Sequence, residues 1–338
     1  MIAKSQNKYY SLYERERKKI ETKLEQSLKN REPKSLYSPS YYVIKGGGKR
    51  LRPLLVLFSV KAAGGKFSQA YNAAVAVELL HNFTLVHDDI MDNADKRRNL
   101  PTLHNKYDLS TAILSGDSLL SIAYESLLKD LSTSNLHNGN NSKAIINSFN
   151  KGLIEVCEGQ SLDKEFELKV NVTINDYLIM IQKKTAAMME MCCNIGALLG
   201  GGTKKEINAL TKFGKNIGIA FQIQDDLLDI VGNENEFGKF VGGDLIEGKK
   251  TYLFLTALNK AKGSHKKDLL NVIKNKGIKK NQIKKYKSIY ETLNVIEESK
   301  AEISKYTAKA LSSIKNLRSK NDRDIFYWLA DSLIKRIR

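Results

Sequence analysis

The amino-acid sequence predicts an all-α fold, and three observations support this. All four prolines lie in the first third of the 338 residues, so no proline interrupts a helix from residue 102 onward. Hydrophobic residues make up 42 % of the chain, which is ample for a buried core. Apolar residues recur at three- and four-residue spacing, and no segment sustains the alternation of a β-strand. The length allows one large domain or two.

The first predicted helix is charged and amphipathic and covers residues 8–32. Pro33 and Pro39 are expected to bracket a loop, and another helix is expected over residues 54–63. Between them, residues 46–53 read GGGKRLRP. Three glycines let the backbone approach a ligand closely, and the cations that follow can bind phosphate oxygens. The alternative is a flexible loop with incidental charges.

The most informative segment, 81–98, follows an apolar helix and reads HNFTLVHDDIMDNADKRR. Residues three or four apart share a helix face, so its three aspartates lie within one turn and repel each other. The ordinary reason for such a cluster is a hard divalent cation, which binds oxygen ligands. Two arginines one loop later could bind phosphate through their guanidinium forks. A solvated acidic helix end would look similar, but the set suggests a Mg²⁺–diphosphate site of Asp88, Asp89, Asp92, Arg97 and Arg98.

A second acidic cluster far downstream makes the solvated alternative unfavourable. Residues 222–229 read QIQDDLLD and again follow an apolar run. Mg²⁺ is usually held by one or two carboxylates together with waters and phosphate oxygens, so two facing rows would hold several ions around one diphosphate. We therefore predict that Asp88 and Asp225 face a common cavity.

Four more helices are expected, over residues 113–128, 143–168, 176–199 and 205–231. The loop at 232–243 follows the second acidic cluster and is rich in glycine and charge. It contains Lys239 and is well placed to close over a substrate. Lys249 and Lys250 are expected to open the next helix, and residues 325–330 to belong to the last one.

The net charge of +18 invites a nucleic-acid or anionic-membrane interpretation. No zinc, helix-turn-helix or aromatic RNA-binding motif accompanies the charge, and lysine and asparagine are abundant everywhere. We therefore predict no nucleic-acid partner. The lysine-dense stretch 259–289 is expected to consist of solvated helix faces and short connections.

The cysteines and the chain start bear on the cellular compartment. Cys157, Cys192 and Cys193 form no set with metal-ligand spacing, which fits a reducing cytosol. The N-terminus has no apolar signal core, and no run reaches the roughly 18 apolar residues of a membrane span. These features predict a cytoplasmic protein with no integral membrane segment.

The motifs in their order resemble those of the trans-isoprenyl diphosphate synthases, or polyprenyl synthetases. They span residues 46–251 and read GGGKRLRP, HDDIMDNADKRR, EGQSLD, KKT, FQIQDDLLD and GKFVGGDLIEGKKT. The resemblance implies one all-helical domain over residues 1–338, the isoprenoid-synthase bundle around a central cavity. It also implies a homodimer and about three Mg²⁺ ions in each active site.

The resemblance assigns a role to each matching residue. The metal ligands would be Asp88, Asp89, Asp92, Asp225, Asp226 and Asp229. The diphosphate of an allylic substrate (dimethylallyl, geranyl or farnesyl) would contact Arg97, Lys184 and Lys239, with Lys249 a further lysine of the closing segment. Isopentenyl diphosphate would contact Lys49, Arg52, His81 and Arg98. Thr185 and Gln222 would place dipoles near a developing cation, so the catalytic set becomes Asp88, Asp89, Asp92, Lys184, Thr185, Gln222 and Asp225.

The implied reaction is condensation of isopentenyl diphosphate with an allylic diphosphate. In this family a bulky residue at the position of Phe83, with small Thr84 beside it and no insertion in DDIMD, goes with a C20 product, geranylgeranyl diphosphate. Phe83 lies five residues before Asp88, roughly 7.5 Å along a helix. The alternatives are a C15 product, a product of C25 or longer, and a non-catalytic partner subunit. A terpene cyclase would lack the cations of residues 49–52, and Phe83 could also be plain core packing.

Overall fold

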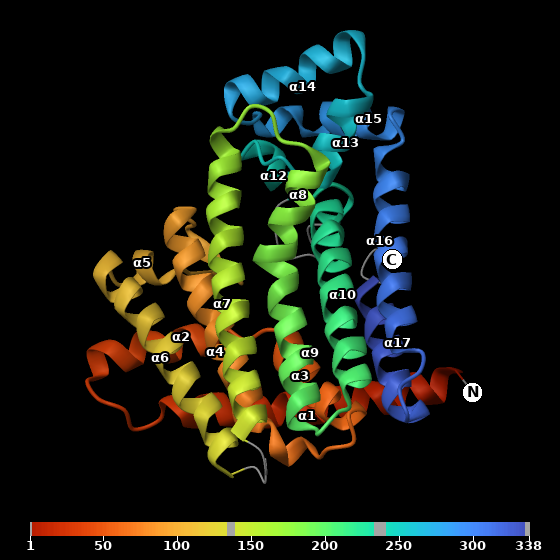
Figure 1. Ribbon diagram of the computed structural model, residues 1–338. Coiled ribbons are helices and arrows are strands. Elements are labelled where there is room, and N and C mark those ends of the chain that lie inside the picture. The colour runs from red at the N-terminus through yellow and green to blue at the C-terminus, as the bar shows by residue number, and fades with distance from the viewer. Residues whose placement is uncertain (1, 134–138, 233–240, 335–338) are drawn as a thin grey trace. The chain divides into compact units, whose positions relative to one another are not determined.

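The computed structural model describes residues 2–133, 139–232 and 241–334, and almost all of its regular structure is helical (Figure 1). The predicted all-α class is confirmed. The helices of the first half are α1 (Ile2–Leu28), α2 (Lys34–Lys45), α3 (Leu51–Ala62), η1 (Phe67–Gln69), α4 (Tyr71–Met91), α5 (Leu103–Lys106), α6 (Leu109–Thr133) and α7 (Gly139–Leu168). Those of the second half are α8 (Ile174–Ile181), η2 (Gln182–Ala186), α9 (Ala187–Leu199), α10 (Lys204–Val231), α12 (Gly243–Ile246), α13 (Tyr252–Lys260), α14 (Gly263–Asn275), η3 (Lys280–Gln282), α15 (Ile283–Thr292), α16 (Val295–Ile314) and α17 (Lys320–Ile334).

Short strands and local breaks refine this picture. Within the described ranges the strands are β1 (Lys96–Arg97) and β2 (Leu100–Pro101), which pair antiparallel. The helix expected over 176–199 is interrupted by the π-helical turn η2. Among the described residues, every helix is either too short or too polar to traverse a lipid bilayer.

Two sequence predictions of loops and helix starts were wrong. Pro39 lies inside α2 instead of bracketing a loop, although a proline within a helix removes one backbone hydrogen bond. The helix tolerates the loss because it buries Pro39 and Ile44 and packs against α6. Lys249 and Lys250 precede α13 instead of opening a helix, because the Thr251 side chain caps α13 by accepting from the N–H of Phe254 at 3.3 Å.

The chain divides into two compact units. Unit 1 comprises residues 1–150, 191–211 and 316–328, and unit 2 comprises residues 151–190, 212–315 and 329–338. The single domain expected over residues 1–338 stays a prediction.

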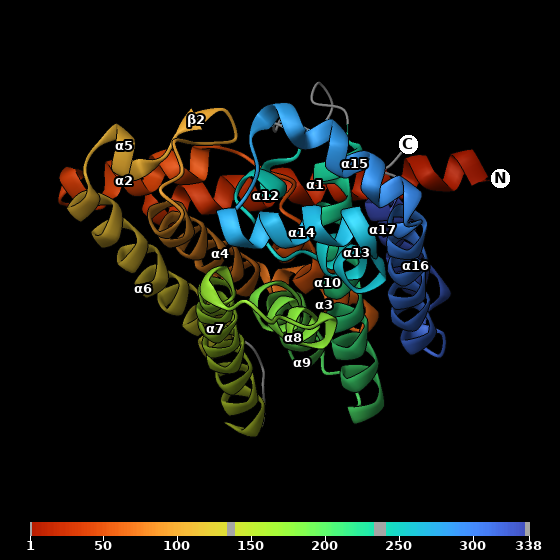
Figure 2. The ribbon, with the colours of Figure 1, turned by 90° about the horizontal axis from the view of Figure 1, so that it is seen from above.

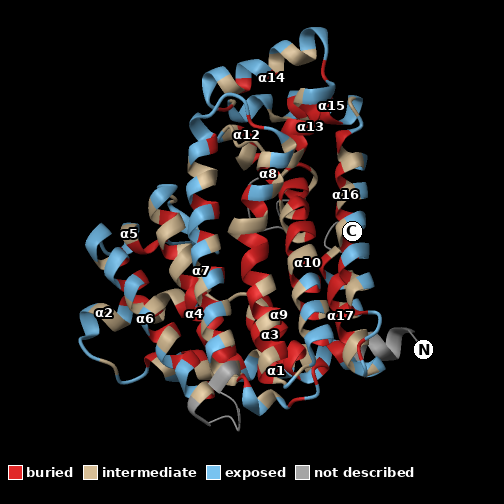
Figure 3. Cartoon of the chain, in the orientation of Figure 1, coloured by how far each residue is buried: buried red, intermediate tan, exposed pale blue. Residues whose placement is uncertain are grey.

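Unit 1 is centred on α4, which packs against α1, α3 and α6. α4 and α6 lie side by side in both ribbon views (Figures 1 and 2). Ten of the twelve residues of α3 are buried (Figure 3). α9 approaches α3 through glycines, since a Cβ on Gly196 would lie 2.3 Å from the carbonyl oxygen of Val56. The helix that carries the first acidic cluster is therefore packed against several helices of its own unit.

The start of α4 is stabilised from another helix. Its N-cap residue, Ala70, has no side-chain acceptor, and the carboxylate of Asp130 on α6 supplies one. Asp130 accepts the backbone N–H of Ala73 at 2.7 Å and the side-chain amide of Asn72 at 2.8 Å. Burial raises the pKa of Asp130 to about 6 in spite of these bonds. Ionisation of the Asp130 carboxyl is therefore less favourable in the folded protein than in water.

We expect the stability of the wild type relative to an Asp130→Asn variant to fall as the pH rises from about 4 to about 6. The raised pKa means that the folded state binds this proton more tightly than the unfolded chain, so the advantage is lost once the folded state ionises. The amide of Asn keeps an acceptor for Ala73 and does not titrate. The shift of about two pKa units sets an upper limit of about 3 kcal/mol on the change. Denaturant unfolding of both proteins across this pH range measures it, and parallel pH profiles would contradict it.

Unit 2 has its own core, built mainly from α8, α10, α13, α15 and α16. α13 buries residues 253–257 in succession and packs against α8, α14, α15 and α16. Tyr177 of α8 and Tyr290 of α15 are among the largest fully buried side chains. Because Ile223 and Leu227 of α10 belong to this core, packing fixes the stretch of α10 that carries the second acidic cluster.

Candidate active site

The first acidic cluster lies at the C-terminal end of α4, in unit 1. Asp88 is half-buried and Asp89 is buried in the last helical turn. Asp92 is exposed and follows the helix directly, with its backbone N–H donating to the carbonyl of Asp88 at 2.9 Å. The three carboxylates therefore belong to one turn, as predicted from their spacing.

The β1–β2 hairpin brings Arg97 back onto this turn. The Nε and Nη2 atoms of Arg97 lie 2.7 and 2.6 Å from Oδ1 of Asp89. A predicted phosphate-binding cation thus pairs with a predicted metal ligand. A diphosphate would suit the guanidinium and a divalent cation would suit the carboxylate, so both groups are already at one place.

The glycine-rich loop between α2 and α3 contacts the next arginine. Arg98 donates to the carbonyl of Gly47. A Cβ on Gly48, which has φ of +140°, would lie 2.9 Å from the Arg98 guanidinium. Only glycine therefore permits both this backbone conformation and this close approach. The exposed Lys49 follows in the same loop.

His81 and Arg52 meet on the adjoining helices. Nη1 of Arg52 lies 3.1 Å from Nε2 of His81, and the guanidinium can only donate. The pKa of His81 is held well below its ordinary value, first by burial and then by the nearby charge of Arg52. His81 is therefore a neutral acceptor that orients Arg52. Structure thus places Arg52 with His81, and Arg98 with the glycine-rich loop that precedes Lys49, all within unit 1.

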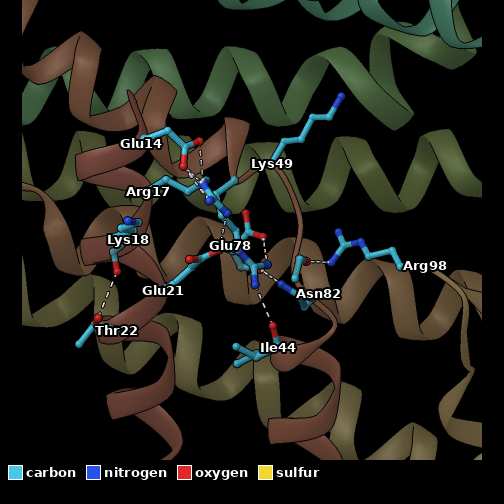
Figure 4. Close-up of polar contacts among 12 residues, drawn as sticks. Glu14, Arg17, Lys18, Glu21, Thr22, Ile44, Lys49, Glu78, Asn82 and Arg98 are labelled. Carbon is cyan, nitrogen blue, oxygen red and sulfur yellow. Dashed lines mark hydrogen bonds and ion pairs between the residues drawn. The ribbon is translucent and has the colours of Figure 1, made fainter. Parts of the chain in front are cut away.

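Sequence reasoning missed a buried ion pair beneath this loop. Arg50, the N-cap residue of α3, has a left-handed backbone with φ of 50°. Its Nη1 lies 2.7 Å from Oε1 of Glu78 on α4, and its Nη2 donates to the carbonyl of Ile44 at 2.7 Å (Figure 4). Both charged side chains are 2 % exposed. The pair fixes the backbone between Lys49 and Arg52.

A sequence signal for this pair was present. Glu78 is the sole charged residue of the run 73–80, and a buried carboxylate needs a cation or several donors. The sequence does not say which of the nearby cations supplies it. Glu78 also lies one turn before His81, so the ion pair and the Arg52–His81 contact lock α3 against the same face of α4.

The second acidic cluster lies on α10, in unit 2. Asp226 is buried, and its two oxygens accept the Tyr177 hydroxyl at 2.6 Å and the Gln222 amide at 2.9 Å. Asp229 accepts the backbone N–H groups of Gly243 and Asp244 at 3.2 and 3.1 Å. Two of the three predicted ligands are thus oriented by hydrogen bonds. Tyr177 is a further contact that the sequence did not suggest.

The acidic environment of α10 disfavours another negative charge. The pKa of Asp226 is raised to about 8, first by burial and then by the charge of Asp244, with Asp225 adding to it. Such repulsion is what a bound cation would relieve. The chemistry of the donors, which are all carboxylate oxygens, fits Mg²⁺. Within the described ranges, however, no three His, Cys, Asp or Glu side chains are grouped closely enough to ligate one metal ion.

The π-helical turn η2 presents two of the predicted catalytic residues. Nζ of Lys184 lies 2.6 Å from Oδ2 of Asp163, and the Thr185 hydroxyl donates to Oε1 of Gln222 at 2.8 Å. A Cβ on Gly159 of α7 would lie 2.2 Å from the backbone nitrogen of Lys184, so α7 can approach this turn only at a glycine. Gln222 then links Thr185 to Asp226, and the three form one hydrogen-bonded chain.

The remaining predicted residues are placed as follows. Lys249 pairs with Glu247 at 2.7 Å, and Lys239 lies outside the described residues. Phe83 and Thr84 are half-buried on α4, one turn and more before Asp88. The Phe83 ring centroid lies 4.6 Å from that of His87. A Cβ on Gly116 of α6 would lie 2.4 Å from Nε2 of His87, so the His87 ring packs against α6 where a glycine leaves room for it.

The two acidic clusters belong to different units. Asp88, Asp89 and Asp92 are in unit 1, whereas Asp225, Asp226 and Asp229 are in unit 2. Convergence of Asp88 and Asp225 on one cavity therefore stays a prediction, as do the roles of the individual residues.

Known proteins give the family of the chain. A profile of the polyprenyl synthetase family matches residues 33–293. A geranylgeranyl diphosphate synthase of Sulfolobus acidocaldarius is 40 % identical over 313 residues, which cover 89 % of this chain and 91 % of the relative. A short chain isoprenyl diphosphate synthase of Methanocaldococcus jannaschii is 40 % identical over 269 residues, 79 % of this chain and 80 % of the relative. Other relatives are named geranylgeranyl or geranylfarnesyl diphosphate synthase.

Solved structures agree with this result. The geranylgeranyl pyrophosphate synthetase of Pyrococcus horikoshii has a TM-score of 0.89 and 34 % identity, over 97 % of this chain and 99 % of that one. The predicted isoprenoid-synthase fold is therefore confirmed. On both grounds, sequence and fold, the chain belongs to the polyprenyl synthetase family.

Proposed function

We propose that this protein is a Mg²⁺-dependent trans-prenyltransferase that condenses isopentenyl diphosphate with an allylic diphosphate and makes geranylgeranyl diphosphate. The observation that carries the proposal is the complete carboxylate set in a chain of this family: Asp88, Asp89, Asp92, Asp225, Asp226 and Asp229. The alternative that is not an enzyme is a non-catalytic partner subunit, which would be expected to lack one of the two aspartate clusters.

These six aspartates would hold the Mg²⁺ ions, about three by family resemblance. When bound, the ions neutralise the leaving diphosphate and so ease ionisation of the allylic C–O bond. The oriented state of Asp226 and Asp229 supports their part in this site, because ligands held by neighbouring hydrogen bonds need little reorganisation.

The basic residues divide between the two substrates. Arg97 and Lys184 already face carboxylates, and with Lys239 and Lys249 they would bind the allylic diphosphate. On the other substrate, Arg52, Lys49 and Arg98 would bind the diphosphate of isopentenyl diphosphate, next to neutral His81. Holding both substrates side by side converts an encounter of two molecules into a step within one complex.

The reaction itself needs little further acid or base chemistry from the protein. The Thr185–Gln222 hydrogen bond supports a role in stabilising the developing allylic cation, since both groups present oxygen dipoles. The double bond of isopentenyl diphosphate attacks the cation, and the departing diphosphate is the natural acceptor of the proton then lost. Apolar walls exclude water, which would quench the cation.

Partners and compartment follow from the same proposal. The enzyme would act as a homodimer in the cytoplasm, with no nucleic-acid partner. Its substrates would be isopentenyl diphosphate and dimethylallyl, geranyl or farnesyl diphosphate.

The direct test is an assay of the purified protein with Mg²⁺, labelled isopentenyl diphosphate and each allylic diphosphate in turn. We expect a C20 diphosphate as the main product, identified by chromatography after removal of the phosphates. C15 or C25 and longer products would keep the reaction but revise the chain length. No product with any starter would refute the proposal.

Phe83 is expected to set the length of the product. Truncation of its ring in Phe83→Ala should open space beyond Thr84 and shift the main product above C20, by at least one five-carbon unit. The His87 contact supports this role because it holds the ring in one place. The matched control is Phe67→Ala, another half-buried phenylalanine of unit 1, which should keep the C20 product. An unchanged product from Phe83→Ala would remove this side chain from the wall.

A further inference from the structure

Positive charge is concentrated in one segment of the chain. Residues 259–289 hold eleven lysines against one aspartate, which gives a net charge of +10 out of +18 for the protein. The segment is about a tenth of the chain but carries more than half of its net charge. A bias towards lysine spread evenly over the surface does not account for this excess.

In unit 2 this segment folds into α14, η3 and α15. The Tyr286 hydroxyl of α15 donates to the backbone carbonyl of Asp268 on α14 at 3.1 Å. Leu269 and Val272 of α14 are buried, as are Tyr286 and Ile289 of α15. These helices therefore form one packed body with a defined outer surface.

The outer surface is basic with one apolar residue in it. Much of α14 is exposed (Figure 3). Leu270 and Lys274 follow Lys267 by three and seven residues on this helix, so the three exposed side chains share one face. Leu270 is 47 % exposed. The sole carboxylate of the segment, Asp268, is paired with Lys285 at 2.7 Å. We call the exposed lysines on this body the basic surface: Lys267, Lys274, Lys276, Lys279, Lys280, Lys284 and Lys285.

We propose that the basic surface binds the anionic headgroups of a lipid membrane. Lysine side chains can place their ammonium groups among lipid phosphates while their stems and an exposed leucine lie against the apolar layer. Nucleic acid is the poorer fit. The segment has no arginine for bidentate phosphate or base contacts, and its single aromatic residue, Tyr286, is buried and cannot stack on a base.

Such binding is reversible and electrostatic. Each lysine near an anionic surface strengthens binding about fivefold, which corresponds to about 1 kcal/mol. The attraction reaches about one Debye length, roughly 8 Å at physiological salt, so only lysines on one body act together. On the proposed function, the product carries a long apolar tail that must leave water, and a membrane-bound enzyme would release it there.

The test is flotation of the full-length protein with vesicles, without substrate. We expect binding to phosphatidylcholine vesicles that contain about 30 % phosphatidylglycerol, little binding to phosphatidylcholine alone, and loss of binding at about 1 M salt. The triple variant Lys267→Gln, Lys274→Gln, Lys284→Gln should bind on the order of 100-fold more weakly. Circular dichroism checks that it folds.

The matched control removes three lysines that are exposed elsewhere in the sequence, in the variant Lys18→Gln, Lys61→Gln, Lys143→Gln. Its net charge equals that of the test variant, but its substitutions lie outside the basic surface, so it should lose less than about fivefold in vesicle binding. Equal losses in the two variants would overturn the proposal, because total charge would then explain binding. So would equal binding to both kinds of vesicle, or a triple variant that loses retention on duplex DNA while its vesicle binding is unchanged. Vesicle binding uses no catalysis, so its failure and failure of the proposed function are distinguishable.

Discussion

Replacing Asp88 with asparagine should lower kcat by about 10²- to 10³-fold, the size of effect seen when one preorganised group that stabilises developing charge is removed. Asp88 lies in the turn that also holds Asp89 and Asp92, and on our proposal it holds a cation against the leaving diphosphate. The amide keeps the size and helical position of the side chain but loses its charge. Turnover at saturating concentrations of both substrates measures the effect, with circular dichroism as a check on the fold.

The control for Asp88→Asn is Asp108→Asn, which removes one charge from the same unit. Asp108 is exposed and accepts the backbone N–H of Thr111 at 2.8 Å, a bond that the asparagine oxygen can also accept. We expect its turnover to stay within about twofold of the wild type, because no change in transition-state charge is involved. Wild-type turnover in Asp88→Asn would refute the metal assignment.

Glu78→Gln should lower the free energy of unfolding by about 3 kcal/mol, because the buried Arg50 guanidinium loses the carboxylate 2.7 Å away and keeps the more distant one of Glu21, 3.9 Å from its Nε. The wild-type ion pair is 2.7 Å long and both side chains are 2 % exposed. The double variant Arg50→Met, Glu78→Met should recover much of that loss, since neither charge is then buried alone. Denaturant unfolding of the single and double variants measures the coupling.

An exposed pair provides the comparison for this prediction. Glu297 and Lys300 on α16 are 2.7 Å apart, and their side chains are 63 and 42 % exposed. Glu297→Gln should therefore cost less than about 1 kcal/mol. Equal costs at Glu78 and Glu297 would contradict the assigned importance of burial.

The same ion pair should affect one substrate more than the other. Arg50 lies between Lys49 and Arg52 in the sequence. Loss of the Arg50–Glu78 ion pair should therefore raise the KM for isopentenyl diphosphate, while the KM for the allylic substrate changes little. A general loss of folded protein would lower turnover and leave both KM values unchanged. The two KM values therefore distinguish an effect of the ion pair on substrate binding from an effect on protein stability.

In the lysine-dense segment, residues 259–289, composition predicts exposure of the helix faces but not the contacts between the helices. Its exposed helix faces were predicted from sequence, and α14 and α15 bear this out. That Asp268 is paired with Lys285 depends on how α14 and α15 pack, whereas the position of Leu270 between Lys267 and Lys274 follows from their spacing on α14. The same residues on separate loops would give no common surface.

The sequence by itself determined the helical class and the turns on which the aspartates lie, because helical periodicity and capping act over three or four residues. Its six motifs in their order resemble those of the family to which the chain belongs. Tertiary structure alone decided that Glu78 meets Arg50, that Asp130 caps α4 and that Tyr177 holds Asp226. These partners are 28, 57 and 49 residues apart, and many side chains of suitable charge or polarity compete at such separations. Only the packing of whole helices selects among them.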